Sequence, residues 1–159
     1  MNRLCRIDID DSAVAPASAQ VVQERRVAIY DLLEENSFAI PGREGQAVPP
    51  GPYGLDLAIR DGRLVFDIST EGGEKLGEFH LSLGPFRQVV KDYFQICASY
   101  YDAVKSLPPA QIEAIDMARR GIHNEGARTL QERLEGKAVV DIDTSRRLFT
   151  LICALIPQG

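Results

Sequence analysis

Hydrophobic and polar residues follow patterns along the chain that predict its secondary structure. In CRIDID, which begins at Cys5, apolar and charged residues alternate, as is typical of a half-buried strand. From Ser18, the expected helix N-cap, apolar residues recur at helical spacing. Four prolines and four glycines then predict a loop at about 41–54. The apolar face of the first helix is expected to contain Val22, Ile29, Leu32 and Leu33.

Two alternating runs, LDLAIR and RLVFDI, flank the pair Asp61-Gly62. This pair suits a type I′ turn, so the runs are predicted to form a β-hairpin. After the turn TEGGEK, the segment LGEFHLSL continues the alternation as a third strand. The three strands form an antiparallel meander, and the N-terminal strand can extend it. Its predicted apolar face comprises Leu55, Leu57, Ile59, Leu64, Phe66, Ile68, Phe79, Leu81 and Leu83.

The pattern changes to helical spacing after Pro85, which predicts a long amphipathic helix up to about residue 106. A second helix follows the two prolines at 108 and 109 and ends near Gly136, and a third, capped by Asp143 or Thr144, is apolar on nearly every side. The fold class is therefore α+β: a three- to four-stranded antiparallel meander packed against a long amphipathic helix and a C-terminal helical pair. The aromatic row Tyr93, Phe94, Tyr100 and Tyr101 is expected in the core or an interface, and Val104 continues the apolar spacing of the helix.

Composition narrows the class of protein. The chain has 159 residues and 45% hydrophobic content, which suits a single globular domain over residues 1–159. It has no run of about eighteen apolar residues, and charges interrupt its first ten positions, so a cytoplasmic protein without membrane contact is expected. The net charge of −5 disfavours nucleic acid as a partner. Cys5, Cys97 and Cys153 lack metal-type spacing and are expected to be small buried residues.

The segment RRGIHNEGART contains one of the two histidines. If the helix continues through Gly121 and Gly126, its apolar stripe also carries Arg119, His123 and Gly126, whereas Glu125 points away. Gly126 would leave room for a backbone or a ligand. The apolar part of the stripe is formed by Ile112, Ile115, Ile122, Leu130 and Leu134.

An arginine on a buried stripe needs an anionic partner, because an unpaired interior charge is costly. One interpretation pairs Arg119 with an internal carboxylate, for which the candidates are Asp8, Asp10, Asp141 and Asp143. The other gives it a bound carboxylate or phosphate. Buried arginines are usually paired within the protein, so we expect the internal partner.

A second group of candidates lies on the polar face of the meander. The two-residue turn places Asp56 opposite Asp67, and His80 on the third strand points to the same side. A carboxylate–imidazole pair between Asp67 and His80 would suit acid–base chemistry or a metal site. We expect instead an ordinary solvated sheet face.

Motifs for other chemistry are missing from the sequence. It contains no G-x-S-x-G elbow, no Walker loop, no G-x-G-x-x-G after a strand and no zinc-protease motif. No cofactor and no metal are therefore predicted.

Three segments, GLDLAIRDGRLVFDI, LSLGPFRQVVKDYFQICASYYDAVKS and ARRGIHNEGARTLQERLEGKAVVDIDTSRRLFTLICAL, carry a resemblance over nearly the whole chain. The order and content of these segments resemble those of a bacterial family of uncharacterised proteins. The resemblance implies a bacterial cytosolic protein, and it implies no activity, cofactor or catalytic residue.

Two functional hypotheses follow. The first is a non-enzymatic regulatory or protein-interaction module, because no catalytic constellation is recognisable. Such a module could form a homodimer. The alternative is an enzyme or sensor that binds a small anionic ligand through Arg119 and His123, with His123 as the candidate catalytic residue.

Overall fold

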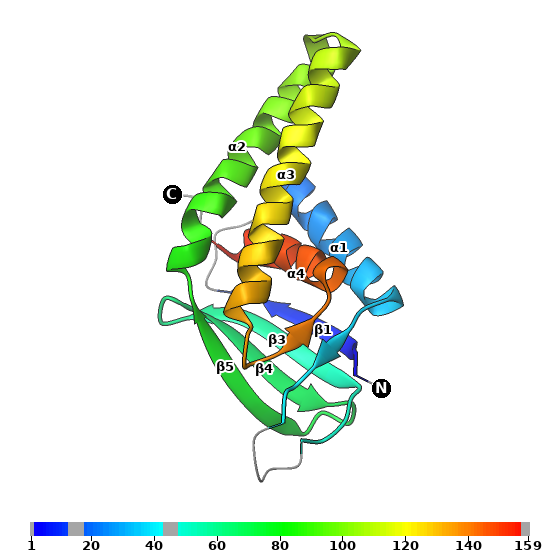
Figure 1. Cartoon of the computed structure of the whole chain (residues 1–159), viewed down its shortest axis with the longest axis vertical. Coiled ribbons are helices and arrows are strands. Elements are labelled where there is room, and N and C mark those ends of the chain that lie inside the picture. The colour runs from blue at the N-terminus through cyan, green and yellow to red at the C-terminus, as the bar shows by residue number, and fades with distance from the viewer. Residues whose placement is uncertain (1, 13–17, 43–47, 157–159) are drawn as a thin grey trace.

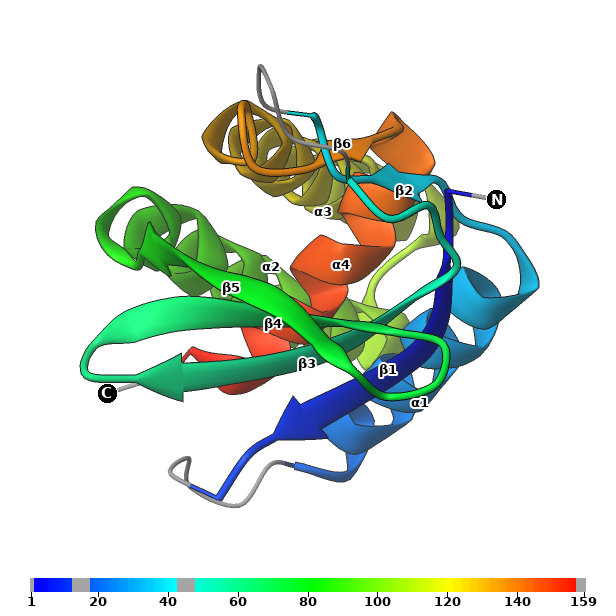
Figure 2. The ribbon, with the colours of Figure 1, turned by 90° about the horizontal axis from the view of Figure 1, so that it is seen from below.

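The computed structural model describes residues 2–12, 18–42 and 48–156. Its elements, in chain order, are β1 (Leu4–Asp10), α1 (Ala19–Glu34), β2 (Phe38–Ala39), β3 (Tyr53–Arg60), β4 (Arg63–Thr70), β5 (Lys75–Ser82), α2 (Gly84–Ser106), α3 (Pro109–Arg133), β6 (Val139–Val140) and α4 (Ile142–Leu155). The helices gather on one face of the sheet, and the α2–α3 hairpin projects away from it (Figures 1 and 2). The α+β class is confirmed.

The main sheet has the strand order β1-β3-β4-β5. The β3–β4–β5 meander is antiparallel as predicted. β1 does extend it, but runs parallel to β3, so the sheet is mixed rather than wholly antiparallel. A parallel pair needs a long crossover connection, and α1 lies within the connection from β1 to β3.

The predicted hairpin turn is confirmed, with Asp61 at φ 52° and Gly62 at φ 71°. Both residues have the positive φ that a type I′ turn requires. The register that follows places Leu57 opposite Phe66 and Asp56 opposite Asp67. The face that carries Leu57 and Phe66 is buried beneath the helices.

α4 occupies the centre of the helical layer, as its apolar sequence predicts. Its N-cap is Asp141, whose Oδ1 accepts a hydrogen bond from the Thr144 amide at 2.9 Å, so the prediction of Asp143 or Thr144 is wrong. Thr144 is buried instead, and its Oγ1 accepts from the Ser37 amide at 2.9 Å. This contact holds Thr144 in the core beside β2, which explains why α4 begins earlier than predicted. The fully buried members of α4 include Leu148, Phe149, Leu151, Ile152 and Leu155.

α3 is continuous through both glycines, which the sequence had left open. The two positions nevertheless differ. A Cβ atom added at Gly126 would lie 2.2 Å from Phe149 Cζ, whereas one added at Gly121 would meet nothing within 4 Å. Gly126 thus allows α4 to approach α3 closely. Beside it, the Ser145 hydroxyl donates to the Ala127 carbonyl at 2.6 Å within the same buried crossing.

Several predictions about burial and boundaries are wrong in detail. β3 begins at Tyr53, so the irregular segment ends two residues earlier than the expected loop 41–54, of which residues 43–47 lie outside the described residues. Ala28 and Leu32 form the buried face of α1, while Leu33 is exposed. Cys5 is only partly buried, because a bulge in β1 turns Leu4 into the core; Cys97 and Cys153 are buried as expected.

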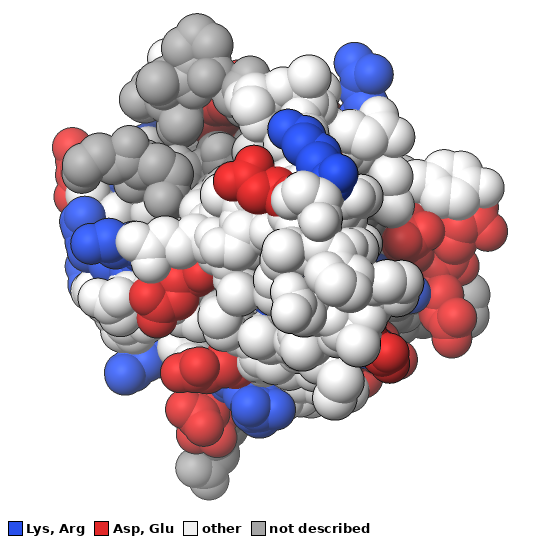
Figure 3. Space-filling model, turned by 90° about the horizontal axis from the view of Figure 1, so that it is seen from above, with Lys and Arg blue, Asp and Glu red and all other residues white. Residues whose placement is uncertain are grey.

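The projecting end of the α2–α3 hairpin is largely uncharged. Viewed from that end, charged side chains lie mainly toward the edge (Figure 3). Val104, predicted on the apolar face of the long helix, is 53% exposed here, and Leu107 and Met117 are also exposed. The hairpin extends beyond the rest of the helical layer, so these residues have nothing to pack on. Among the described residues, no helix is long and apolar enough to cross a membrane.

We predict opposite effects of alanine at the two α3 glycines. Gly126→Ala should destabilise the fold by about 2 kcal/mol or more, because the methyl group overlaps the Phe149 ring. Gly121→Ala is the matched control. It should stabilise the fold by about 0.5–1 kcal/mol, since alanine favours a helix interior over glycine and the space is open. Urea denaturation of the two variants measures both effects. Equal stability of the two variants would contradict the close helix crossing.

Candidate functional site

A pocket of about 430 Å³ lies between α1, α3 and α4. It contains two of the residues singled out from the sequence, Arg119 and His123. α2 contributes the buried residue Tyr93 to its wall. Its other lining residues are Gln23, Glu24, Val27, Ala28 and Asp31 from α1, Arg120 and Asn124 from α3, and Arg146, Arg147 and Thr150 from α4. The pocket thus joins segments that are far apart in the sequence.

Arg119 has an internal partner, but not one of the four predicted carboxylates. Its Nε and Nη2 atoms donate to Asp116 Oδ1 at 3.0 and 2.5 Å, one helical turn back, and its guanidinium lies 5.1 Å from the centroid of the Tyr100 ring. Burial lowers the pKa of Arg119, but the hydrogen bonds and charge of Asp116 together with Tyr93 outweigh burial, so the net shift of the pKa is upward. The prediction of a distant carboxylate assumed that the apolar stripe of α3 is fully buried. The Arg119 side chain is in fact 30% exposed.

Asp116 serves a second arginine as well. Its Oδ2 lies 3.2 Å from Nε of Arg120, which also lines the pocket. The hydrogen bond to Arg119 lowers the pKa of Asp116, which keeps it ionised. One carboxylate therefore serves two guanidinium groups, and this part of the pocket keeps an excess of positive charge.

His123 lies between aromatic rings and polar groups of the pocket. Its Nε2 is 2.8 Å from Thr150 Oγ1, and its ring centroid is 5.2 Å from those of both Tyr93 and Phe149. Burial, reinforced by the charges of Arg146 and Arg119, lowers the pKa of His123 to about 4. The imidazole is therefore neutral at pH 7 and acts there as a hydrogen-bonding group.

Arg146 and Arg147 were not singled out from the sequence, where they were considered only as the start of the last helix. Arg146 is 46% exposed and forms a 3.4 Å ion pair with Asp143, while Arg147 donates to the Glu35 carbonyl at 3.2 Å. A signal did exist: Arg146 and Thr150 are four residues apart on an otherwise apolar helix, so they share one face. The sequence could not predict that this face of α4 contacts His123 on α3.

Gly126 does not line the pocket. The space that its missing side chain leaves is filled by the Phe149 ring, not by a backbone or a ligand as predicted. Its contribution to the site is indirect. Close approach of α4 at Gly126 brings Thr150, the residue after Phe149, to His123.

The polar face of the sheet does not bring together the Asp67–His80 pair that the sequence suggested. Asp56 does lie opposite Asp67, but Glu78 is the neighbour of Asp67 on β5, and His80 lies opposite Val65. His80 Nε2 contacts Glu78 Oε1 at 3.1 Å. The register of β5, which the turn geometry of the first hairpin does not determine, separates His80 from Asp67.

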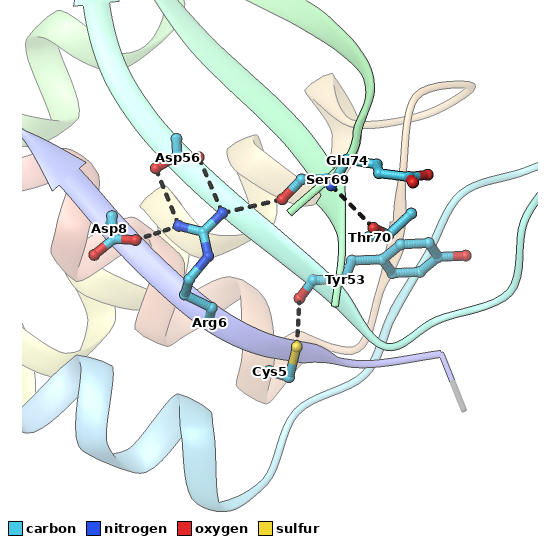
Figure 4. A network of polar contacts seen from close by, with 8 residues as sticks. All are labelled: Cys5, Arg6, Asp8, Tyr53, Asp56, Ser69, Thr70 and Glu74. Atoms are coloured by element: carbon cyan, nitrogen blue, oxygen red, sulfur yellow. Dashed lines mark hydrogen bonds and ion pairs between the residues drawn. The ribbon is translucent and has the colours of Figure 1, made fainter. Parts of the chain in front are cut away.

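Arg6 relieves the carboxylate repulsion on this face. It donates to both carboxylate oxygens of Asp56, at 3.2 and 3.1 Å, to Asp8, and to Ser69 Oγ at 3.0 Å (Figure 4). Gly54 makes room for it, since a Cβ there would lie 2.6 Å from Arg6 Nη2. Among the described residues, no group of three or more His, Cys, Asp or Glu side chains could hold a metal ion. This network is a structural link between β1 and β3.

Fold and site together define an α+β protein with an arginine-rich pocket between three helices. The chain matches the family model described as "Uncharacterised protein family (UPF0262)" over residues 1–158, and it belongs to this family. It is 80% identical to a UPF0262 protein of Paracoccus denitrificans, over 98% of this chain and 96% of that relative. Relatives in Cereibacter sphaeroides (74%, over 98% of each chain) and Ruegeria pomeroyi (70%, over 98% and 96%) are similar. No solved structure gives a significant match.

The lowered pKa of His123 predicts a pH-dependent stability. Between about pH 6.5 and pH 4 the unfolded chain binds a proton at His123 and the folded chain does not, so stability falls as the pH drops through this range. We expect His123→Gln to reduce the wild-type loss between pH 7 and pH 4.5 by about 2 kcal/mol, measured by urea denaturation.

His80→Gln is the control for this measurement, because His80 lies on the far face of the sheet, outside the pocket. It should retain the wild-type loss of stability between the two pH values. An unchanged pH dependence in His123→Gln would show that the imidazole is not buried as a neutral group.

Proposed function

We propose that this protein binds a small organic anion, a carboxylate or a phosphate, in the pocket between α1, α3 and α4. The supporting observation is the charge of the lining: four arginines, Arg119, Arg120, Arg146 and Arg147, against two carboxylates, in a chain of net charge −5. Guanidinium groups bind carboxylates and phosphates through paired, charge-assisted hydrogen bonds. A pocket of about 430 Å³ is of the size that small ligands occupy.

The anion is expected between Arg119 and Arg146. Both charges act on His123, so both guanidinium groups lie near the imidazole ring, one from α3 and one from α4. The Arg146 ion pair with Asp143 is long and exposed, so it costs little to exchange for a ligand. Val27, Ala28 and Tyr93 supply the apolar part of the lining, which suits a ligand with a short carbon skeleton.

Binding, rather than catalysis, is the proposed activity. At pH 7 the neutral His123 has no proton to give as a strong acid, and its Nε2 is engaged with Thr150. The Thr150 hydroxyl lies 3.3 Å from the Arg146 carbonyl, to which it donates. Among the described residues that line the pocket there is no serine, cysteine or lysine to act as a nucleophile. The pocket is accordingly proposed as the sensing site of a non-enzymatic regulatory module in the bacterial cytoplasm.

The proposal is tested by thermal shift and calorimetric titration with small carboxylates and phosphorylated metabolites at low salt. At least one probe should raise the melting temperature, and Arg146→Gln should weaken its binding about tenfold or more, because a charged hydrogen bond is lost. Arg119→Gln should weaken it similarly.

Arg87→Gln is the matched control. Arg87 is an exposed residue of α2 outside the pocket, so its variant makes the same change in net charge without touching the lining. Its affinity should stay within about twofold of the wild type. The proposal fails if no probe shifts the melting temperature, or if folded Arg146→Gln and Arg119→Gln proteins bind as the wild type does.

A second candidate function, protein interaction, is supported by the uncharged end of the α2–α3 hairpin. Val104, Leu107 and Met117 are exposed there, and exposed apolar surface favours association. The expected partner is a second copy of this chain, which accords with the homodimer expected from the sequence.

Light scattering after size-exclusion chromatography tests this association. We expect a mass about twice that of the 17.5 kDa chain at high protein concentration, and a return to the monomer mass in Met117→Lys. Glu125→Lys, an exposed change on the same helix away from the hairpin end, should not alter the mass. A wild-type protein that remains monomeric at every concentration would exclude the homodimer.

A further inference from the structure

The wall of the pocket that α1 forms differs in charge from the walls that α3 and α4 form. Glu24, Val27, Ala28 and Asp31 line it at spacings of three and four residues, so they occupy one face of the helix. The two carboxylates are two turns apart, about 10 Å along the helix axis. The pocket therefore has basic walls from α3 and α4 and an acidic and apolar wall from α1.

Glu24 faces the pocket without a cation of its own. Its Oε1 accepts a hydrogen bond from the Tyr101 hydroxyl at 3.3 Å, which holds the carboxylate beside α2. Among the ion pairs of the described residues none includes Glu24, although four arginines share its pocket. Arg119, one of the basic wall residues, is bound to Asp116 instead. A carboxylate in this position can receive a cation that a ligand brings.

Glu24 and Arg119 belong to the same end of the pocket. Tyr101 contacts Glu24, and the neighbouring Tyr100 lies against the Arg119 guanidinium. Arg147 marks the opposite end, because it donates to the Glu35 carbonyl just after α1. A ligand whose anionic group lies between Arg119 and Arg146 thus has Glu24 within the same end of the cavity.

On the basis of the anion site proposed above, we infer that the ligand is a zwitterion of the amino-acid type: its carboxylate or phosphate binds at Arg119 and Arg146, and its ammonium group binds at Glu24. The ammonium donates to the Glu24 carboxylate, whose other partner is the Tyr101 hydroxyl. Pairing opposite charges of ligand and pocket in this way also selects against dicarboxylates and simple phosphates, which leave Glu24 unpaired beside a second negative charge.

Matched pairs of compounds test the inference by calorimetric titration of the whole chain. Glutamate is compared with glutarate, and phosphoserine with 3-phosphoglycerate, so that within each pair one compound lacks the amine. The amine-bearing member of at least one pair should bind about tenfold tighter, as one charge-assisted hydrogen bond provides.

Variants of α1 identify the residue that causes the preference for the amine-bearing compound. Glu24→Gln keeps the shape of the side chain and should reduce the preference for the amine to about twofold or less. Glu34→Gln removes the same charge from an exposed position of α1 outside the pocket and should preserve the full preference. Asp31→Asn should also preserve it. Circular dichroism and thermal unfolding verify that each variant is folded.

The outcomes separate this inference from the proposed function. If the anions bind but an amine adds no affinity in either pair, or if the preference is lost in Asp31→Asn and retained in Glu24→Gln, the zwitterion inference is wrong and the anion site stands. If no compound of either pair binds and no other anion does, the anion site itself is wrong.

Discussion

The close crossing of α3 and α4 at Gly126 determines how the rest of the molecule is arranged. The Phe149 ring occupies the place of a side chain at Gly126, and the Ser145 hydroxyl donates to the backbone of Ala127 within the same contact. Small residues let the two backbones approach, and the aromatic ring fills the remaining space, so the interior stays close-packed. α1 and the sheet then pack around α4, whose buried side chains belong to the common core.

The same crossing creates the pocket. It places Thr150 against His123 and brings the arginines in the second turn of α4 into the same pocket as those of α3, while α1 forms the third side. Positive charge therefore accumulates in a protein whose overall charge is negative. Such a local excess is maintained because each arginine has only a partial internal partner: Asp116 is shared, Asp143 is exposed, and Arg147 has a carbonyl oxygen. These partial contacts stabilise the arginines in the pocket, and they support the proposal that an anion binds between them.

Sequence patterns predicted most elements correctly because each of these patterns is local. Alternation around Asp61-Gly62 determined the first hairpin and its register, and the helical stripe placed Arg119 and His123 on one side of α3. Two failures are local, since the α4 N-cap is Asp141 and the partner of Arg119 is Asp116, one helical turn away. The larger failures concern relations between distant segments. Sequence reasoning could not give the parallel direction of β1, the register of β5 that parts His80 from Asp67, or the contribution of Arg146, because no local pattern contains them.

The sequence by itself determined the fold class, the first hairpin and the two residues at the centre of the candidate site. Periodicity, turn chemistry and the cost of burying a charge are sufficient for those features, since they act over a few residues at a time. Only the tertiary structure decided that Gly126 receives an aromatic ring, that Thr150 meets His123, and that a wall with Glu24 faces the arginines. These depend on how helices far apart in the chain pack together, and packing is a property of the whole molecule.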